Sequence, residues 1–214
     1  DITVLQTMAD QLATAIENAR LFKRTQATLS ETQALYRFSE IISDELELQA
    51  IYEAVARLLV EELGYASSWV AALDQEKQVL RGVAGAGEGV TEEVIHSTTV
   101  LSDADRNSPT KNLAVMAIQR REPFVINDPL RDERIAELPE EMRRVMGKII
   151  DVPIFLGEAL VGLISAVRPL RAADGSRSAD ISQQEVRLIQ AIAAQASGAI
   201  QRAQLFEQAN SSLY

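Results

Sequence analysis

The stretch KIIDVPIFLGEALVGLISAV, residues 148–167, predicts two long β-strands. Branched and other apolar side chains dominate Lys148–Leu156 and Leu160–Val167, as is typical of strands. The three residues between them, Gly157-Glu158-Ala159, include a glycine and suit a short hairpin loop. We therefore expect the two strands to pair as a hairpin.

A second hairpin is predicted upstream, with strands at Ser67–Leu73 and Val79–Ala84 on either side of a charged turn. Gly85, Gly87 and Gly89 follow the second of these strands. Because glycine is common in turns, we expect these three residues to end the strand in a flexible loop.

Helices are predicted before and after the strands. Apolar residues recur on one face of Leu48–Leu63, and Gly64 provides a C-terminal stop. Near the other end of the chain, Ser182 and Glu185 have the three-residue spacing of a capping box, which predicts the start of a final helix.

The region between the hairpins predicts short elements. Proline at position 109 suits the first turn of a helix, where its missing N–H would have no partner. We expect a strand at 97–101, a helix opening at 108–109, a strand at 123–127, one or two helical turns at 139–146 and a surface loop at 171–180.

The two ends of the chain contain a repeat. Residues 4–22, VLQTMADQLATAIENARLF, match residues 188–206, LIQAIAAQASGAIQRAQLF, at eight positions. The shift of 184 residues has the size of a domain and is too long for a solenoid repeat. We therefore expect three parts: 1–35 as the final helix of a preceding, related domain plus a helical linker, 36–206 as one domain, and 207–214 as the start of an outgoing helix.

The segment from Ile2 to about Glu45 contains no proline or glycine and predicts one long helix. Apolar or small residues recur along it in alternating steps of three and four, which is the pattern of a coiled-coil seam. Such a helix needs a partner, because a long apolar stripe is not stable alone in water. The predicted entry seam consists of Leu5, Met8, Leu12, Ala15, Ala19, Phe22 and Leu29, and the aligned exit seam consists of Ile189, Ile192, Ala196, Ala199, Ala203 and Phe206.

Composition excludes several classes of function. The formal net charge of −10 disfavours nucleic acid as a partner, because nucleic-acid binding depends on Lys and Arg neutralising phosphates. The chain has no cysteine, so it has no disulfide and no thiolate nucleophile. Its single histidine, His96, is too few for a histidine-based metal site. No apolar run is long enough to predict a membrane-spanning helix.

Several stretches, in their order and wording, resemble the GAF domain family, which comprises sensor modules of bacterial signalling proteins and of some phosphodiesterases. They are the helix Ile51–Leu63 with Gly64, and residues 117–128, 152–164 and 189–206. The resemblance covers about 36–206. It implies an α+β fold: an antiparallel sheet of five or six strands with long N- and C-terminal helices packed on one face and a pocket on the other.

The resemblance also implies partners. Members commonly dimerise through their first and last helices and pass signals along them to a kinase, cyclase or phosphatase. We therefore expect a homodimer in the bacterial cytoplasm, covalently linked to an effector such as a histidine kinase. Whether the seams pair in parallel or antiparallel stays open at this point.

Three ligand subtypes of the family can be compared with this chain residue by residue. Bilin-binding members have a cysteine and an Asp-Ile-Pro motif, and this chain has neither. Cyclic-nucleotide-binding members have an Asn-Lys signature, whereas Lys111-Asn112 has the reverse order. Haem-binding members use a histidine, and we expect His96 to be a solvated or hydrogen-bonded surface residue instead. No cofactor is predicted.

Candidate pocket residues lie on strands and in the loops that usually roof the pocket of such domains. Alternation directs some strand residues to the pocket and others to the core, and the sequence does not fix which. Charged loop residues would orient an anion or a polar ligand; alternatively, they are ordinary surface charges over a filled core. The candidates are Trp69, Thr99, Leu101, Arg106, Met116, Phe124, Ile126, Asp128, Arg134 and Val152.

We therefore expect a non-catalytic sensory or relay domain that passes a conformational signal to an effector. The alternative is a purely structural dimerisation spacer without a ligand. A GAF-fold enzyme, such as a reductase of free methionine sulfoxide, would by resemblance need catalytic cysteines, which the chain lacks. The acidic pairs Glu61-Glu62, Glu92-Glu93 and Glu140-Glu141 are sequence neighbours that do not face one another on a helix, so no catalytic residue is predicted.

Overall fold

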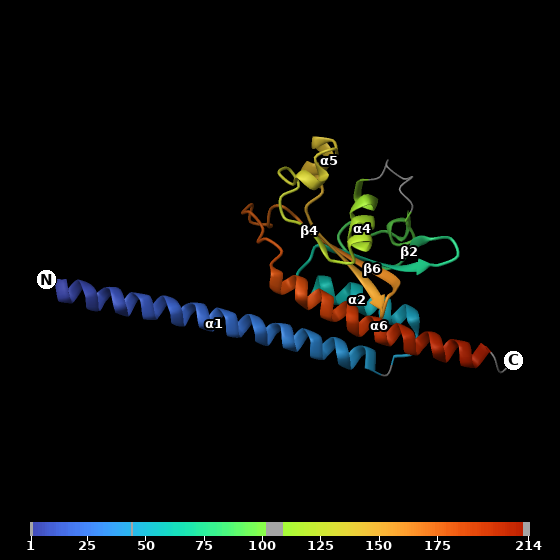
Figure 1. The fold of residues 1–214 in the computed structure, drawn as a ribbon, viewed down its shortest axis with the longest axis horizontal. Coiled ribbons are helices and arrows are strands. Elements are labelled where there is room, and N and C mark those ends of the chain that lie inside the picture. The colour runs from blue at the N-terminus through green and yellow to red at the C-terminus, as the bar shows by residue number, and fades with distance from the viewer. Residues whose placement is uncertain (1, 44, 102–108, 212–214) are drawn as a thin grey trace. The chain divides into compact units, whose positions relative to one another are not determined.

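The computed structural model describes residues 2–43, 45–101 and 109–211. The chain divides into two compact units, residues 1–37 and residues 38–214 (Figure 1). Within the described ranges, no helix is long and apolar enough to cross a lipid bilayer.

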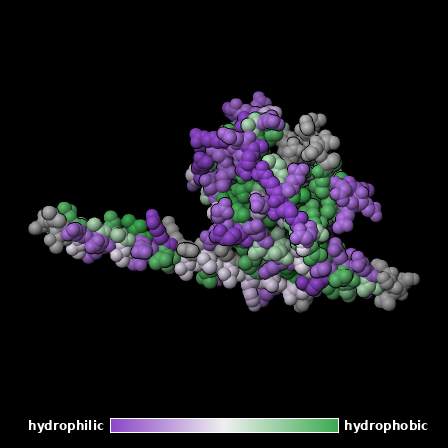
Figure 2. Space-filling model, in the orientation of Figure 1, coloured by the Kyte–Doolittle hydropathy of each residue, from purple (hydrophilic) through white to green (hydrophobic). Residues whose placement is uncertain are grey.

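The first unit is formed by helix α1, Ile2–Ser43, whose last residues belong to the second unit. The large apolar residues of the predicted entry seam are exposed along this helix. Leu5 is 66% exposed, Leu12 63% and Phe22 64%. Figure 2 shows apolar side chains interspersed with polar ones along the helix. Among the described residues of the first unit, none covers this apolar stripe.

The second unit contains one six-stranded sheet in the order β3-β2-β1-β6-β5-β4. Every neighbouring pair of strands is antiparallel. Both predicted hairpins are present, since β1 pairs with β2 and β5 pairs with β6. The strands are β1 Ser67–Asp74, β2 Val79–Gly87, β3 Thr98–Val100, β4 Phe124–Ile126, β5 Lys148–Leu156 and β6 Ala159–Arg168.

Helices lie on both faces of the sheet (Figure 1). Helices α2 (Leu48–Glu61) and α6 (Gln183–Ser211) pack on one face, against β1, β2 and β5. Helices α3 (Glu92–Ile95) and α4 (Pro109–Arg120) contact the other face. A 3₁₀ turn, Glu133–Ile135, and α5 (Glu140–Val145) lie between β4 and β5. The prediction of an α+β fold, with an antiparallel sheet of five or six strands and long N- and C-terminal helices, is confirmed.

The two faces of the sheet have separate cores. Because strand residues alternate between faces, Ile150, Val152 and Ile154 of β5 point to the α2/α6 side. Ile149 of the same strand belongs to the other core, together with Leu163 of β6. The buried members of that second core are Ala71, Leu80, Leu113, Ala114, Ala117, Phe124, Ile126, Ile135, Met146, Ile149 and Leu163.

Glycines shape β2, and the prediction of a loop there is wrong for Gly85 and Gly87, which belong to the strand. A Cβ at Gly82 would lie 1.7 Å from the carbonyl oxygen of Ile95. A Cβ at Gly85 would lie 2.7 Å from a methyl group of Val90. The glycines therefore let the segment that carries α3 approach the sheet more closely than any side chain would allow.

The predicted exit seam is wrong for five of its six residues. Ile189, Ile192, Ala196, Ala199 and Ala203 are each completely buried within the chain. Their helix, α6, packs on β5 and α2, so this apolar stripe belongs to the core of its own domain. Phe206, at the far end, is 46% exposed.

The start of α6 confirms the predicted capping box. Ser182 Oγ accepts a hydrogen bond from the backbone N–H of Glu185 at 3.2 Å. The backbone N–H of Ser182 donates in return to Glu185 Oε2 at 2.8 Å. These two bonds satisfy groups that the first helical turn otherwise leaves without partners.

Candidate functional site

The sheet face opposite α2 and α6 contains a cavity of about 490 Å³. Its volume and its mainly apolar lining are typical of a small-molecule site. The side chains come from three central strands and from α3, β3 and α4. They are Trp69, Glu93, Val94, Ser97, Thr99, Leu113, Ile149, Asp151, Leu163, Ser165 and Val167. This set is called the central cavity below.

Asp151 is the polar group deepest in the central cavity. It lies in the middle of β5, a strand buried on both faces, and only 2% of its surface is exposed. Ser165 of β6 is its direct cross-strand partner and donates a hydrogen bond to its carboxyl group. Burial raises the pKa of Asp151 from 3.8 to about 7, against the smaller lowering effect of that hydrogen bond.

The described side chains that line the central cavity include two carboxylates, Asp151 and Glu93, and no basic group. Lys148 is near Asp151 in sequence but lies on the other side of β5, where its Nζ donates to Ser178 O at 2.6 Å and Asp180 Oδ1 at 2.5 Å. Arg168 of β6 is likewise engaged, with Glu185 and over the ring of Tyr65. Neither cation neutralises Asp151.

One wall of the central cavity is fixed by a bond between Trp69 and α3. The indole Nε1 of Trp69 donates to the carbonyl oxygen of Ile95 at 3.1 Å. A side chain at position 82 would clash with both partners of this bond, so Gly82 allows the indole ring and α3 to hold each other in place. His96, the next residue, has 67% of its side chain exposed, contacts Glu92 at 3.2 Å and does not line the cavity.

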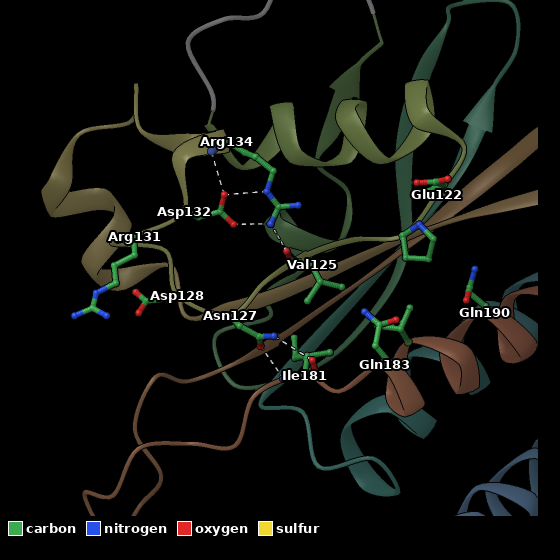
Figure 3. Close-up of a pocket in the computed structure, with 12 residues that line it drawn as sticks. Glu122, Val125, Asn127, Asp128, Arg131, Asp132, Arg134, Ile181, Gln183 and Gln190 are labelled. Carbon is green, nitrogen blue, oxygen red and sulfur yellow. Dashed lines mark hydrogen bonds and ion pairs between the residues drawn. The ribbon is translucent and has the colours of Figure 1, made fainter.

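A second hollow, of about 730 Å³, lies between the edge strand β4 and the start of α6 (Figure 3). We call it the edge groove. It is more polar than the central cavity and is lined by Glu122, Pro123, Val125, Asn127, Asp128, Arg131, Asp132, Arg134, Ile181, Gln183, Val186 and Gln190.

Bonds within the protein already satisfy several polar groups of the edge groove. Arg134 donates to Asp132 at 2.8 Å and to the carbonyl oxygen of Val125, as the dashed lines in Figure 3 show. This bond to Arg134 lowers the pKa of Asp132. Asn127 bonds both backbone groups of Ile181, at 3.0 and 2.7 Å. These contacts attach the sheet edge to neighbouring loops, so we assign the edge groove a structural role.

The structure distributes the ten predicted pocket residues over several places. Trp69 and Thr99 line the central cavity. Phe124 and Ile126 belong to the core beside it, and Leu101 and Met116 pack against that core.

The remaining candidates lie elsewhere. Asp128 and Arg134 line the edge groove. Val152 is buried on the opposite face, because its neighbour Asp151 points into the central cavity. Arg106 lies outside the described residues.

Asp151, Ser165 and Leu113 line the central cavity but were not among the predicted pocket residues. One signal was present: Asp151 is a lone carboxylate within the apolar run of Lys148–Leu156. A charge at the centre of a buried strand is rare unless it has a partner or a function.

Comparison with known families identifies a match to the GAF domain over residues 45–201. The comparison with curated proteins finds no match. Solved structures share the fold at low sequence identity. The GAF domain of an Acinetobacter phosphoenolpyruvate-protein phosphotransferase has a TM-score of 0.63 at 17% identity, over 83% of this chain and 97% of that one.

Two further structures show how varied proteins of this fold are. The second GAF domain of DevS from Mycobacterium smegmatis has a TM-score of 0.54 at 20% identity, over 76% of this chain and 99% of that one. Free methionine-R-sulfoxide reductase from Neisseria meningitidis, solved with its substrate, has a TM-score of 0.62 at 13% identity, over 84% of this chain and 93% of that one. At these identities the likeness concerns the fold alone.

Proposed function

The chain belongs to the GAF domain family, and on that premise we propose that it is a non-catalytic sensory and relay module of a cytoplasmic signalling protein. In this proposal the second unit senses a small molecule in the central cavity. Helix α1 pairs with α1 of a second copy, in parallel, and the paired helices transmit a conformational change to a covalently linked effector domain, such as a kinase, cyclase or phosphatase.

The exposed apolar stripe of α1 is the observation on which the relay part of the proposal depends. Leu5, Met8, Leu12 and Leu29 are between 57% and 66% exposed, and they recur with the spacing of a coiled-coil seam. Exposed apolar residues that recur on one side of a helix are typical of a surface that binds another protein. A second copy of the same helix offers a complementary row.

A specific observation supports a second arrangement for residues 4–22. These residues repeat the sequence of 188–206 in α6, where Ile189, Ile192 and Ile200 are buried in the domain that contains the sheet and α2. Of the large apolar residues there, only Leu205 and Phe206, at the end of the repeat, are exposed. Ile16 is 47% exposed, for example, whereas its counterpart Ile200 is 1% exposed. By analogy, residues 4–22 would pack on a preceding domain of the same fold, and only the seam from Phe22 onward would face a second copy.

A catalytic role has no support in the sequence. The reductase of the same fold is an enzyme by its name, but this chain is only 13% identical to that protein. It has no cysteine to act as a thiolate nucleophile. A domain that binds a ligand without transforming it is the simpler function for the central cavity.

Sedimentation equilibrium of the full chain tests the relay proposal. We expect a dimer for the wild type. Leu12→Glu and Leu29→Glu should each raise the dissociation constant at least about tenfold, because each places a charge in the seam. Ala13→Glu, exposed on the side of α1 away from the seam, is the matched control and should leave the dimer intact.

The outcomes separate the arrangements. If only Leu29→Glu weakens the dimer, the seam begins near Phe22, as the second arrangement requires. A wild-type chain that is monomeric at all practical concentrations would refute dimerisation through α1.

A further inference from the structure

The charged side chains that the described residues contribute to the lining of the central cavity are both acidic. Asp151 lies deep in it and Glu93 lies at its exposed side, while the described residues that line it include no Lys, Arg or His. Among the described residues of the lining, an anionic ligand would meet two carboxylates and no compensating cation. The charges of these residues therefore disfavour organic acids and phosphates.

Within the part of the chain that the structure describes, Asp151 has no cationic partner. Ser165 gives it one hydrogen bond, whereas an ionised carboxylate can accept about four. Lys148 and Arg168, the basic residues of β5 and β6, are bound to Asp180 and Glu185. A buried carboxylate without a cation is costly, and a ligand that brings a positive charge removes that cost.

The rest of the lining suits the apolar part of such a ligand. Trp69, Leu113 and Leu163 present an indole ring and aliphatic side chains around Asp151. Because the Trp69 N–H is already bonded to Ile95, the ring offers apolar surface more than a free donor. A volume of about 490 Å³ accommodates a ligand of small-metabolite size.

We propose that the central cavity binds a small organic cation, an ammonium-type molecule whose charged nitrogen pairs with Asp151 and whose apolar part contacts Trp69, Leu113 and Leu163. This inference rests on the proposed function, because it takes the central cavity to be the ligand site of the module. It deepens that function by assigning the charge of the ligand.

Matched probes test the charge preference in the full chain. Phenethylammonium, 2-phenylethanol and phenylacetate have similar apolar parts and carry positive, neutral and negative groups. Binding of each is measured at about pH 8 by calorimetry and by thermal shift. We expect phenethylammonium to bind at least about tenfold more tightly than the neutral or anionic probe.

A variant locates the site. Asp151→Asn should reduce the affinity for phenethylammonium at least about tenfold, whereas Asp128→Asn, in the edge groove, should leave it unchanged. In the wild type, the affinity for phenethylammonium should fall about tenfold from pH 8 to about pH 6. Asp151 has a pKa of about 7, so at the lower pH it is protonated and must lose that proton before it pairs with the ammonium group. Glu93 is the other carboxylate among the described residues that line the cavity.

Two results of the probe comparison would contradict the proposal. Equal or tighter binding of the neutral or anionic probe would overturn the charge assignment and leave the cavity as a ligand site. Absence of binding by the ammonium probe at millimolar concentration would also overturn the assignment. The wild-type comparison needs no variant, so it stands even if Asp151→Asn folds poorly. The relay proposal is tested separately, by sedimentation.

Discussion

Asp151 is a carboxyl group placed where its surroundings oppose ionisation. Burial at the centre of β5 raises its pKa to about 7, so the folded protein holds a proton that the unfolded chain releases near pH 4. Between these two pH values the folded state binds more protons than the unfolded state. Raising the pH through this window therefore destabilises the fold.

The Asp151→Asn variant should remove this dependence. From about pH 5 to about pH 7, the unfolding free energy of the wild type should fall relative to that of the variant by about 1.4 kcal/mol per pH unit. Above about pH 7 the difference should level off, with the variant more stable. Denaturant unfolding at several pH values measures this, and parallel pH profiles for the two proteins would contradict the proposed state of Asp151.

Gly82 provides a second test at the residue scale. Gly82→Ala places a methyl group against the carbonyl oxygen of Ile95 and the indole nitrogen of Trp69, at 1.7 and 2.4 Å before any relaxation. We expect a loss of about 1–3 kcal/mol in stability and a changed tryptophan fluorescence spectrum.

Gly198→Ala is the matched control for Gly82→Ala. Its new Cβ meets nothing closer than 3.9 Å, and alanine favours the helix, so stability should be unchanged or higher by up to about 1 kcal/mol. Equal effects of the two substitutions would show that α3 does not pack closely on β2.

The sequence alone predicted only part of the site. Trp69 and Thr99 were among the predicted pocket residues, because each lies in a segment predicted to be a strand of the sheet. Val152 and Asp151 could not be assigned to their faces, because a shift of one residue exchanges the two sides of a strand. The side of β5 that faces the cavity is set by its pairing with β6 and by α6, which are tertiary contacts.

At the scale of elements, one sequence pattern has two structural outcomes. The large apolar residues of the repeated segment are exposed in α1, whereas in α6 those up to Ile200 are buried, although eight residues of the segment are identical. Periodicity reports that a helix has an apolar face, but it does not report what covers that face. The prediction of an exit seam failed for this reason, whereas the helix itself and its capping box were predicted from local chemistry.

The capping box at the start of α6 should contribute measurable stability. Ser182→Ala removes the acceptor for the N–H of Glu185 and should cost about 1 kcal/mol. Ser39→Ala, at an exposed position within α1, should change stability by less than about 0.5 kcal/mol. Thermal or urea unfolding compares the two variants, and an equal loss in both would argue against a role for the cap.

At the scale of the whole molecule, the α+β architecture and the antiparallel hairpins followed from the sequence, since each hairpin depends on local contacts and a short turn. Two features of the described residues support the proposed function: a central cavity with a carboxylate that no cation neutralises, and a helix with an exposed apolar stripe. Our central claim is that the stripe is the surface through which two copies pair in parallel and relay a signal.

Because the chain has no cysteine, a single introduced cysteine reports this pairing directly. In a parallel, in-register pair, Leu12→Cys and Leu29→Cys each lie opposite themselves, within the Cα separation of about 4.4–6.8 Å that a disulfide allows. Ala13→Cys points away and is the control. We predict rapid oxidative cross-linking to a covalent dimer at both seam positions and slow cross-linking at Ala13→Cys. Cross-linking at the seam that is no faster than at the control would contradict the account.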